Sequence, residues 1–237
     1  MRLGAVTGLV IVAATLGGGV AAPAADASAE ADVRPTQKVA LLLKSHKIVW
    51  APGAPRARGI SASRPITGGQ TALPVTGHAT TKDGIRWLRV KVPGRPNGRS
   101  GWIARRGTVL TKTPWHLVVR TSSRRVLVYR RGRLVRKFAA IVGKPSTPTP
   151  HGRFFVEESV RMRSGASGGP YALALSARSN VLQEFMGGPG QIAIHGVANL
   201  GGTPGTAVSH GCVRLANRNI GWLAARVAPG APVTIRR

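Results

Sequence analysis

Short apolar runs separated by turn-forming residues fill most of the chain beyond residue 37. The runs have the length of strands, and Pro, Gly, Ser and Asn stand between them. In the stretch RWLRVKV the polar and apolar positions alternate with a period of two, which is typical of a strand with one buried face. The pattern predicts a small all-β unit over residues 38–112, with strands at residues 38–43, 47–50, 71–80, 86–92 and 100–104.

The same strand pattern continues over residues 113–237. Val126, Val128 and Leu134 stand at alternating positions on either side of Gly132, which predicts a hairpin with its turn in the sequence RRGR. A loop rich in Pro and Thr follows, and further strands are expected in FFVEES, PYALALSA, QIAIHG and VTI. The predicted fold class is therefore mainly β.

One helix is predicted near the C-terminus. Asn217 is a suitable N-cap, and the sequence APGAP would end the helix before the last strand. Four apolar residues then follow at the spacing i, i+3, i+4, i+7 of one helical face, namely Ile220, Leu223, Ala224 and Val227.

Residues 1–27 are expected to be an export signal. Arg2 precedes an apolar run, and Ala25–Asp26–Ala27 has the small-residue spacing of a cleavage site. An uncleaved membrane anchor is the alternative, but three consecutive glycines and the alanine-rich end of the run favour cleavage near Ala27. This predicts an exported protein of the cell envelope that meets the membrane only through its signal segment, with residues 28–37 as a linker.

The chain is strongly basic, with 35 Lys and Arg residues against seven Asp and Glu residues and a net charge of +28. Loss of the signal would remove Arg2 and Asp26 and leave that charge unchanged. Such a field favours polyanionic partners. Export argues against nucleic acid and favours an anionic polymer of the cell wall. The alternative is that the positive charge reflects an arginine-rich composition and serves no binding partner.

Cys212 is the only cysteine, so it cannot form an internal disulfide. It is then a small buried apolar residue, a metal ligand or a nucleophile. A nucleophilic cysteine reacts as its thiolate, so a neighbouring group must lower its pKa or accept its proton. Histidine is the usual base at neutral pH, and His195 and His210 lie nearby in the sequence.

His195 is the better candidate for the base. It ends a predicted strand and can approach Cys212 from a neighbouring strand, whereas His210 belongs to the same turn as the cysteine. His210 is expected to shape that turn or to face the substrate. No acidic residue follows Glu184, so a backbone carbonyl such as that of Gly196 is expected to orient the His195 ring.

The residues around Cys212 also predict binding groups. Gly211 permits backbone angles that direct successive N–H groups at one point, which would make residues 210–212 an oxyanion hole. Arg214 is expected to hold a substrate carboxylate through two parallel hydrogen bonds.

Two other interpretations of Cys212 remain open at this point. It could be an ordinary core cysteine beside unrelated histidines. A zinc site made by His195, His210 and Cys212 would lack the paired spacing of structural sites and a carboxylate base. No metal and no other cofactor is predicted.

Several motifs together carry a family resemblance over about residues 114–237. The sequence IHG followed by SHGCVRL, with VLVYRRGRLVRKF, TPTPHGRF, GPYALALSA and the terminal helix, resembles the L,D-transpeptidase catalytic domain of the YkuD family. In the first unit, WLRV followed by GRSGWI resembles bacterial SH3-like modules; an ordinary β accessory domain is the alternative.

The resemblance implies a β-sandwich-like catalytic domain over residues 113–237, preceded by an SH3-like β module over residues 38–112. It implies Cys212 as nucleophile and His195 as proton donor and acceptor. Ser209, His210 and Gly211 are expected to form the turn before Cys212. The expected substrate contacts are Arg214, Ser209 and Gly196. Gly196 departs from family members that carry serine after the first histidine.

The implied substrate is a peptidoglycan stem peptide. The enzymes of this family take a tetrapeptide stem as acyl donor, release its terminal D-alanine and pass the acyl group to an amine of a second stem. Transfer to water, which would make an L,D-carboxypeptidase, is one alternative. A cationic wall-binding protein without catalysis is another.

Overall fold

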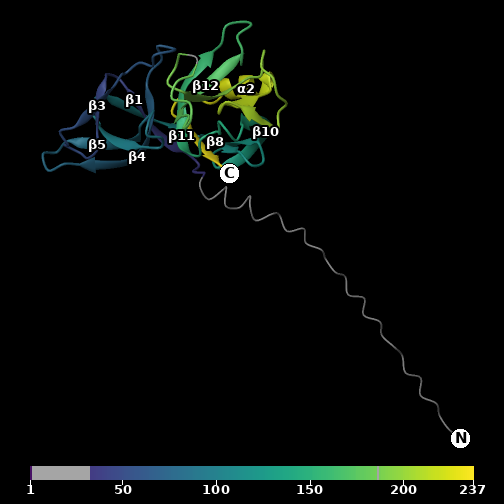
Figure 1. The fold of residues 1–237 in the computed structure, drawn as a ribbon. Helices are drawn as coiled ribbons and strands as arrows, with labels where there is room; N and C mark the ends of the chain where they lie inside the picture. Colours follow the sequence, from purple (N-terminus) through teal and green to yellow (C-terminus); the bar gives the residue numbers. More distant parts are fainter. Residues whose placement is uncertain (2–32, 186) are drawn as a thin grey trace. The chain divides into compact units, whose positions relative to one another are not determined.

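The computed structural model describes Met1 and residues 33–185 and 187–237. The predicted export signal, apart from Met1, and the first five residues of the predicted linker lie outside the described residues. The described strands form two sheets, and the chain passes from one to the other between Thr113 and Trp115 (Figure 1). The mainly β fold class predicted from the sequence is confirmed.

The first sheet has seven strands, paired antiparallel in the order β3-β2-β6-β5-β4-β1-β7. Its core is apolar and includes Leu42, Ile48, Leu73 and Ile103, each almost fully buried. The strands are β1 (Gln37–Leu42), β2 (His46–Val49), β3 (Ala57–Ile60), β4 (Ala72–Thr80), β5 (Arg86–Lys91), β6 (Ser100–Ala104) and β7 (Thr108–Thr113).

Five of these strands coincide with the predicted runs, while β3 and β7 were not predicted. Neither has an alternating apolar face: β3 buries only Ile60, and β7 buries only its terminal threonines. They are strands because β2 and β1 offer them a neighbour to pair with. The likeness of residues 38–112 to an SH3-like module stays a prediction.

The second sheet has nine strands in the order β14-β10-β15-β13-β12-β11-β16-β8-β9, and β10 also pairs with β9. The predicted hairpin between β9 and β10 is confirmed, with positive φ at Arg131 and Gly132 in its turn. The strands are β8 (Trp115–Arg120), β9 (Arg125–Arg130), β10 (Arg133–Gly143), β11 (Gly152–Arg161), β12 (Tyr171–Arg178), β13 (Gln191–His195), β14 (Ala207–Ser209), β15 (Val213–Leu215) and β16 (Pro232–Arg236).

The predicted helix is α2 (Asn217–Ala224), the one helix of the described residues. Ile220 and Leu223 are buried in the core of the second sheet, as the spacing predicted. The N-cap prediction was wrong, because the cap is Ala216 and Asn217 is the first helical residue. The Asn217 side chain instead accepts a hydrogen bond from the backbone N–H of Val197, at 2.9 Å.

Two residues tie neighbouring segments to these cores. Val33, in the segment predicted as a linker, is buried against Val118 and Leu127 of the second sheet. Phe155 belongs to β11 of the second sheet, yet its side chain is buried in the core of the first sheet. The two sheets therefore share part of one apolar core.

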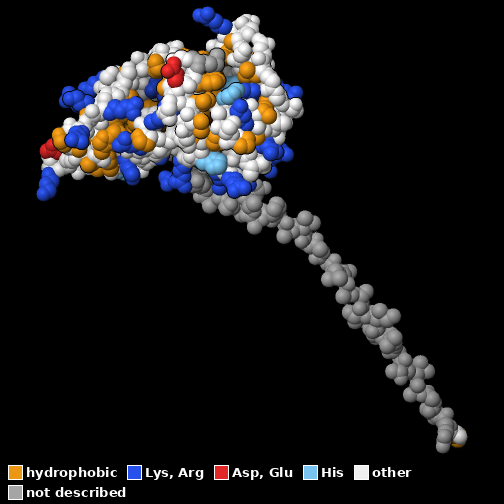
Figure 2. All heavy atoms as spheres, viewed as in Figure 1, with side chains coloured by type: hydrophobic (Ala, Val, Ile, Leu, Met, Phe, Trp, Pro, Cys, Tyr) orange, Lys and Arg blue, Asp and Glu red, His pale blue; other side chains and the backbone are white. Residues whose placement is uncertain are grey.

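Basic side chains are spread over the described surface. Figure 2 shows Lys and Arg over much of the visible face and acidic side chains at only a few places. Two of the seven acidic residues, Glu157 and Glu158, are almost fully buried. No helix among the described residues is long and apolar enough to cross a bilayer.

Candidate active site

The register of β13 and β15 brings His195 and Cys212 to one face of the second sheet. The two strands are parallel, with Ile194 opposite Val213 and His195 opposite Arg214. Ile194 and Val213 are fully buried in the core, so His195 and Arg214 point to the other face. Cys212 precedes Arg214 by two residues and shares that face, where Arg214 acts electrostatically on both His195 and Cys212.

A backbone carbonyl orients the His195 ring, as predicted. Nδ1 lies 2.8 Å from the carbonyl oxygen of Gly196. A carbonyl only accepts hydrogen bonds, so Nδ1 carries the proton of a neutral ring and Nε2 keeps a lone pair. Burial lowers the pKa of His195, the hydrogen bond to Gly196 opposes this, and the charge of Arg214 lowers it again. His195 is therefore neutral at neutral pH and can accept a proton through Nε2.

Cys212 is half-buried, and its sulfur lies 4.0 Å from the carbonyl oxygen of Gln191. Burial raises the pKa of the Cys212 thiol, and smaller effects of the Ala193 backbone and of Arg214 oppose the rise. The Cys212 thiol and the His195 imidazole are therefore both uncharged at neutral pH.

The turn before the cysteine is held by Ser209. Gly211 has a φ of 117°, a conformation that glycine adopts readily, as the sequence predicted. The Ser209 hydroxyl accepts a hydrogen bond from Gly211 N at 3.2 Å and donates one to the Cys212 carbonyl at 2.6 Å. The Gly211 N–H is therefore turned to Ser209, and the oxyanion hole expected from residues 210–212 stays a prediction.

His210 and Arg214 flank the turn on its exposed side. The His210 ring is exposed and stacks on Phe185, with 5.7 Å between ring centroids and an interplanar angle of 28°. Arg214 Nη1 donates to the carbonyl of Gly201 at 2.9 Å, while its Nε is buried with no hydrogen-bond partner in the described part of the chain. Both side chains border the space next to Cys212.

Comparison with known proteins identifies the family. The L,D-transpeptidase catalytic domain family, YkuD, matches residues 114–235, which is the second sheet with its helix. The chain belongs to this family.

Two curated L,D-transpeptidase relatives match the same half of the chain. The YkuD protein of Bacillus licheniformis is 34% identical over 122 residues, which span 52% of this chain and 66% of that protein. L,D-transpeptidase 1 of Mycobacterium tuberculosis is 32% identical over 130 residues, spanning 50% of this chain and 49% of that protein. The matched region thus covers 66% of the first relative and 49% of the second.

Among solved structures, an L,D-transpeptidase from Mycobacterium smegmatis aligns with a TM-score of 0.41 at 19% identity. The alignment covers 68% of this chain and 98% of that structure.

In this L,D-transpeptidase domain two buried threonines brace the cysteine turn, and the sequence reasoning missed both. Thr147 Oγ1 donates to the carbonyl of Ser209 at 3.2 Å, and Thr149 Oγ1 donates to the carbonyl of Gly211 at 2.9 Å. Thr149 Oγ1 also accepts from Gly143 N at 2.9 Å. The available signal was the alternation of threonine and proline in this loop, because proline removes backbone donors and leaves the hydroxyls to satisfy nearby carbonyls.

Two residues predicted to contact the substrate, Ser209 and Gly196, make hydrogen bonds within the protein. Ser209 is fully buried, and its hydroxyl is engaged within the turn. Gly196 is buried, and its N–H donates to the carbonyl of Gly168 at 2.7 Å. A Cβ at Gly196 would collide with the carbonyl of Gly169, so the position excludes the serine found in some family members. The Ser209 hydroxyl and the Gly196 N–H are thus both engaged within the protein, and a substrate contact by either residue stays a prediction.

The loop that ends in Gly168 and Gly169 lies against the His195 ring. A Cβ at Gly168 would stand 2.7 Å from His195 Nδ1, and Gly168 has a positive φ. Backbone thus covers one side of the imidazole. Within the described residues no three His, Cys, Asp or Glu side chains are grouped so as to hold a metal ion.

Proposed function

We propose that this protein is an exported peptidoglycan L,D-transpeptidase in which Cys212 is the nucleophile and His195 the base. The proposal rests above all on the hydrogen bond from His195 Nδ1 to the Gly196 carbonyl, because it leaves Nε2 as a proton acceptor on the face that carries Cys212. Membership of the family and the 34% identity to a relative of that name support the reaction class.

In the first half-reaction, the proton of Cys212 Sγ passes to His195 Nε2 as the sulfur attacks a carbonyl carbon of the donor tetrapeptide stem. The tetrahedral intermediate collapses when His195 returns the proton to the departing amine of D-alanine. A C–S bond has then replaced a C–N bond, and the stem is held as a thioester. N–H groups of residues 210–212 other than that of Gly211 are the candidate donors to the oxyanion.

In the second half-reaction, an amine of another stem attacks the thioester and loses a proton to His195. The C–S bond breaks, the proton returns to the sulfur, and a peptide cross-link is released. Water in place of the amine would give a shortened stem. We assign to Arg214 the binding of a donor carboxylate, through N–H groups other than the Nη1 donor that bonds the Gly201 carbonyl.

The rest of the chain fits this role. The export signal would bring the enzyme to its substrate, and the positive surface would hold it on anionic wall polymers. The SH3-like module over residues 38–112 completes the proposed domain order.

The decisive experiment is intact-mass measurement of the purified protein after exposure to a carbapenem, followed by muropeptide analysis with tetrapeptide substrate. One adduct per chain is expected, and Cys212→Ser should remove it, because a serine hydroxyl is far less acidic than a thiol. Absence of any adduct on the folded, reduced wild type would overturn the proposal. Shortened stems without cross-linked dimers would identify the carboxypeptidase instead.

A further inference from the structure

The loop between β12 and β13, described at residues 179–185 and 187–190, approaches the cysteine turn at two points. Phe185 stacks on His210, two residues before Cys212. Directly after the loop, at the first residue of β13, the carbonyl of Gln191 lies 4.0 Å from the Cys212 sulfur. This β12–β13 loop therefore lies beside the turn that carries the thiol.

Arg95, which follows β5 of the first sheet, holds that loop by its backbone. Its Nη1 donates to the carbonyl of Pro189 at 2.9 Å, and its Nη2 donates to the carbonyls of Ser179 at 2.8 Å and Leu182 at 3.0 Å. These carbonyls come from the beginning, the middle and the end of the loop. A planar guanidinium with several fixed donors can satisfy three such acceptors at once, which a lysine ammonium on a flexible stem does less well.

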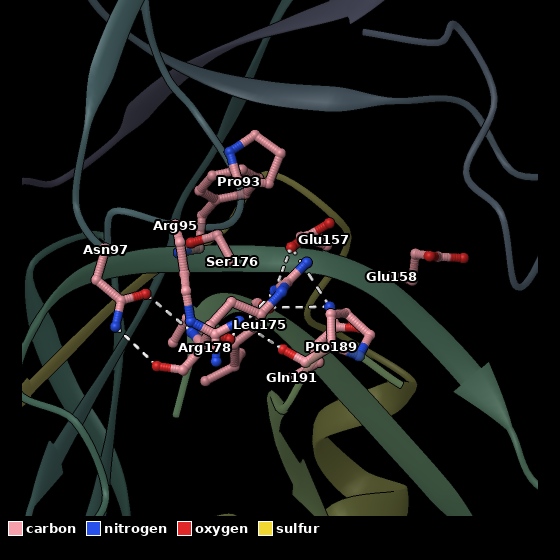
Figure 3. A network of polar contacts seen from close by, with 12 residues as sticks. Pro93, Arg95, Asn97, Glu157, Glu158, Leu175, Ser176, Arg178, Pro189 and Gln191 are labelled. Carbon is pink, nitrogen blue, oxygen red and sulfur yellow. Dashed lines mark hydrogen bonds and ion pairs between the residues drawn. The ribbon is translucent and has the colours of Figure 1, made fainter. Parts of the chain in front are cut away.

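The base of this contact is rigid, because the β5–β6 loop is bonded to the end of β12 (Figure 3). Asn97 Oδ1 accepts from Arg178 N at 2.9 Å, and Asn97 Nδ2 donates to Arg178 O at 2.7 Å. Gly94 N donates to the carbonyl of Ser176 at 3.2 Å. Arg95 is thus fixed at both sides by residues that already pair with the second sheet.

A buried cluster of charged side chains joins the two sheets near this contact. Glu157 forms an ion pair with Arg64, which lies between β3 and β4 of the first sheet. It also accepts a hydrogen bond from Arg178 Nη1 at 3.0 Å. The same carboxylate oxygen accepts from Gln191 Nε2 at 3.3 Å, at the start of the strand that ends in His195 (Figure 3). The first sheet and the cysteine site are therefore linked by direct polar contacts.

We propose that Arg95 is a positioning residue of the active site, through which the first sheet shapes the surface that binds the acyl-donor peptide. The surface is the β12–β13 loop, whose Val181 and Phe185 are apolar and exposed, with Phe185 stacked on His210 of the cysteine turn. An extended peptide reaching Cys212 meets this loop on one side. The proposal rests on the proposed function of Cys212, and it gives the first sheet a role in substrate binding in addition to any contact with the wall.

The first test compares Arg95→Ala, Arg95→Lys and the control Arg99→Ala. Arg99 is in the same loop and has the same charge, but it lies over the Trp50 ring, 3.7 Å from its centroid. The readout is the rate of Cys212 acylation by a donor tetrapeptide as a function of its concentration. Arg95→Ala removes the charge-assisted hydrogen bonds to the loop. It should raise the half-saturating concentration of the donor tetrapeptide about tenfold or more, while the limiting rate stays within about threefold of wild type. Arg95→Lys should recover part of the loss, and Arg99→Ala should equal wild type.

The second test does not depend on catalysis. Glu184 is exposed in the β12–β13 loop, whereas Glu157 and Glu158 are buried. Glu30 is the remaining glutamate of the sequence, and fragment masses distinguish cleavage after Glu30 from cleavage after Glu184, so a glutamyl endopeptidase reports on this loop in the native protein. Arg95→Ala should speed cleavage after Glu184 about tenfold under native conditions, and Arg99→Ala should not.

The outcomes separate the two proposals. Equal half-saturation and equal cleavage for Arg95→Ala and Arg99→Ala would overturn the positioning role. A limiting rate that falls with an unchanged half-saturating concentration would overturn it as well. Wild-type protein that takes up no acyl group would overturn the proposed function, while the cleavage rates would still show whether Arg95 holds the loop.

Discussion

The candidate active site and the junction between the two sheets satisfy their polar groups in opposite ways. At the junction, the buried carboxylate of Glu157 lies between the guanidinium groups of Arg64 and Arg178. At the active site, His195 is oriented by a backbone carbonyl, and the cysteine turn is held by the hydroxyls of Ser209 and Thr149. Fixed charges therefore hold the sheets together, whereas the hydrogen bonds that orient His195 and the cysteine turn come from uncharged groups, with Arg214 as the charged neighbour of both residues.

The difference follows from what each region must do. A carboxylate on His195 would raise its pKa and favour the protonated ring, which cannot act as a base. The Gly196 carbonyl orients the ring with a much weaker effect, so burial dominates and the pKa of His195 is lowered. At the junction, burial lowers the pKa of Arg178 to about 10, and the group still stays charged at neutral pH.

The largest effect is expected from the base itself. His195→Ala should slow acylation of Cys212 by about 10²- to 10⁴-fold, the usual contribution of a positioned base. His210→Ala should cost much less, because that ring stacks on Phe185 at the surface. Acyl uptake followed by mass spectrometry measures both variants. The reverse order, with His210→Ala inactive and His195→Ala nearly unaffected, would assign the base to His210.

At the junction, Glu157→Gln should lower the free energy of unfolding by about 3–5 kcal/mol, because it leaves the Arg178 guanidinium without a counter-charge and leaves Arg64 with Glu158 alone. Urea denaturation followed by tryptophan fluorescence measures the change. Glu184→Gln is the matched control, since Glu184 is exposed and should change stability by no more than about 0.5 kcal/mol. Equal stability of the two variants would mean that the cluster does not join the sheets.

Loss of the Thr149 hydroxyl, which supports the cysteine turn, should have an intermediate effect. Thr149→Val keeps the shape of the side chain but leaves the Gly211 carbonyl without its hydrogen bond, which predicts a loss of about 1–3 kcal/mol in stability. Thr111→Val, at an exposed position of β7, is the control. If Thr149→Val were as stable as the control and acylated at the wild-type rate, the turn would not need the brace.

The smallest effect is expected from pH near neutrality. Because the pKa of His195 is lowered below its ordinary value of about 6.5, the ring stays neutral as the pH falls from 8 to 6.5. The acylation rate should therefore change by less than about twofold over that range and decline only at lower pH. A decline that begins above pH 6.5 would show a raised pKa and hence a charged partner on the ring.

The sequence predicted the strands that carry their own apolar pattern and missed those that depend on a neighbour. The run SGWIA coincides with β6, whereas β3 is exposed except for Ile60 and owes its conformation to β2. At the site, the Gly196 carbonyl was predictable because no acidic residue follows Glu184.

Other features of the site depend on contacts between distant segments, which a single sequence does not display. Thr149 meets Gly211 across 62 residues, and Arg95 meets Ser179 across 84 residues. Ser209 was expected to face the substrate because the sequence places it beside the reactive turn. It is buried because its hydroxyl is needed by two backbone groups of that same turn.

The raised pKa of Cys212 has a consequence for the chemical durability of the protein. Thiolates attack peroxides and disulfides, so a sulfur that stays protonated in the resting protein is oxidised slowly. The chain has no second cysteine that could resolve a sulfenic acid as an internal disulfide. In an oxidising compartment, the half-buried and protonated state of this single thiol would itself slow its oxidation.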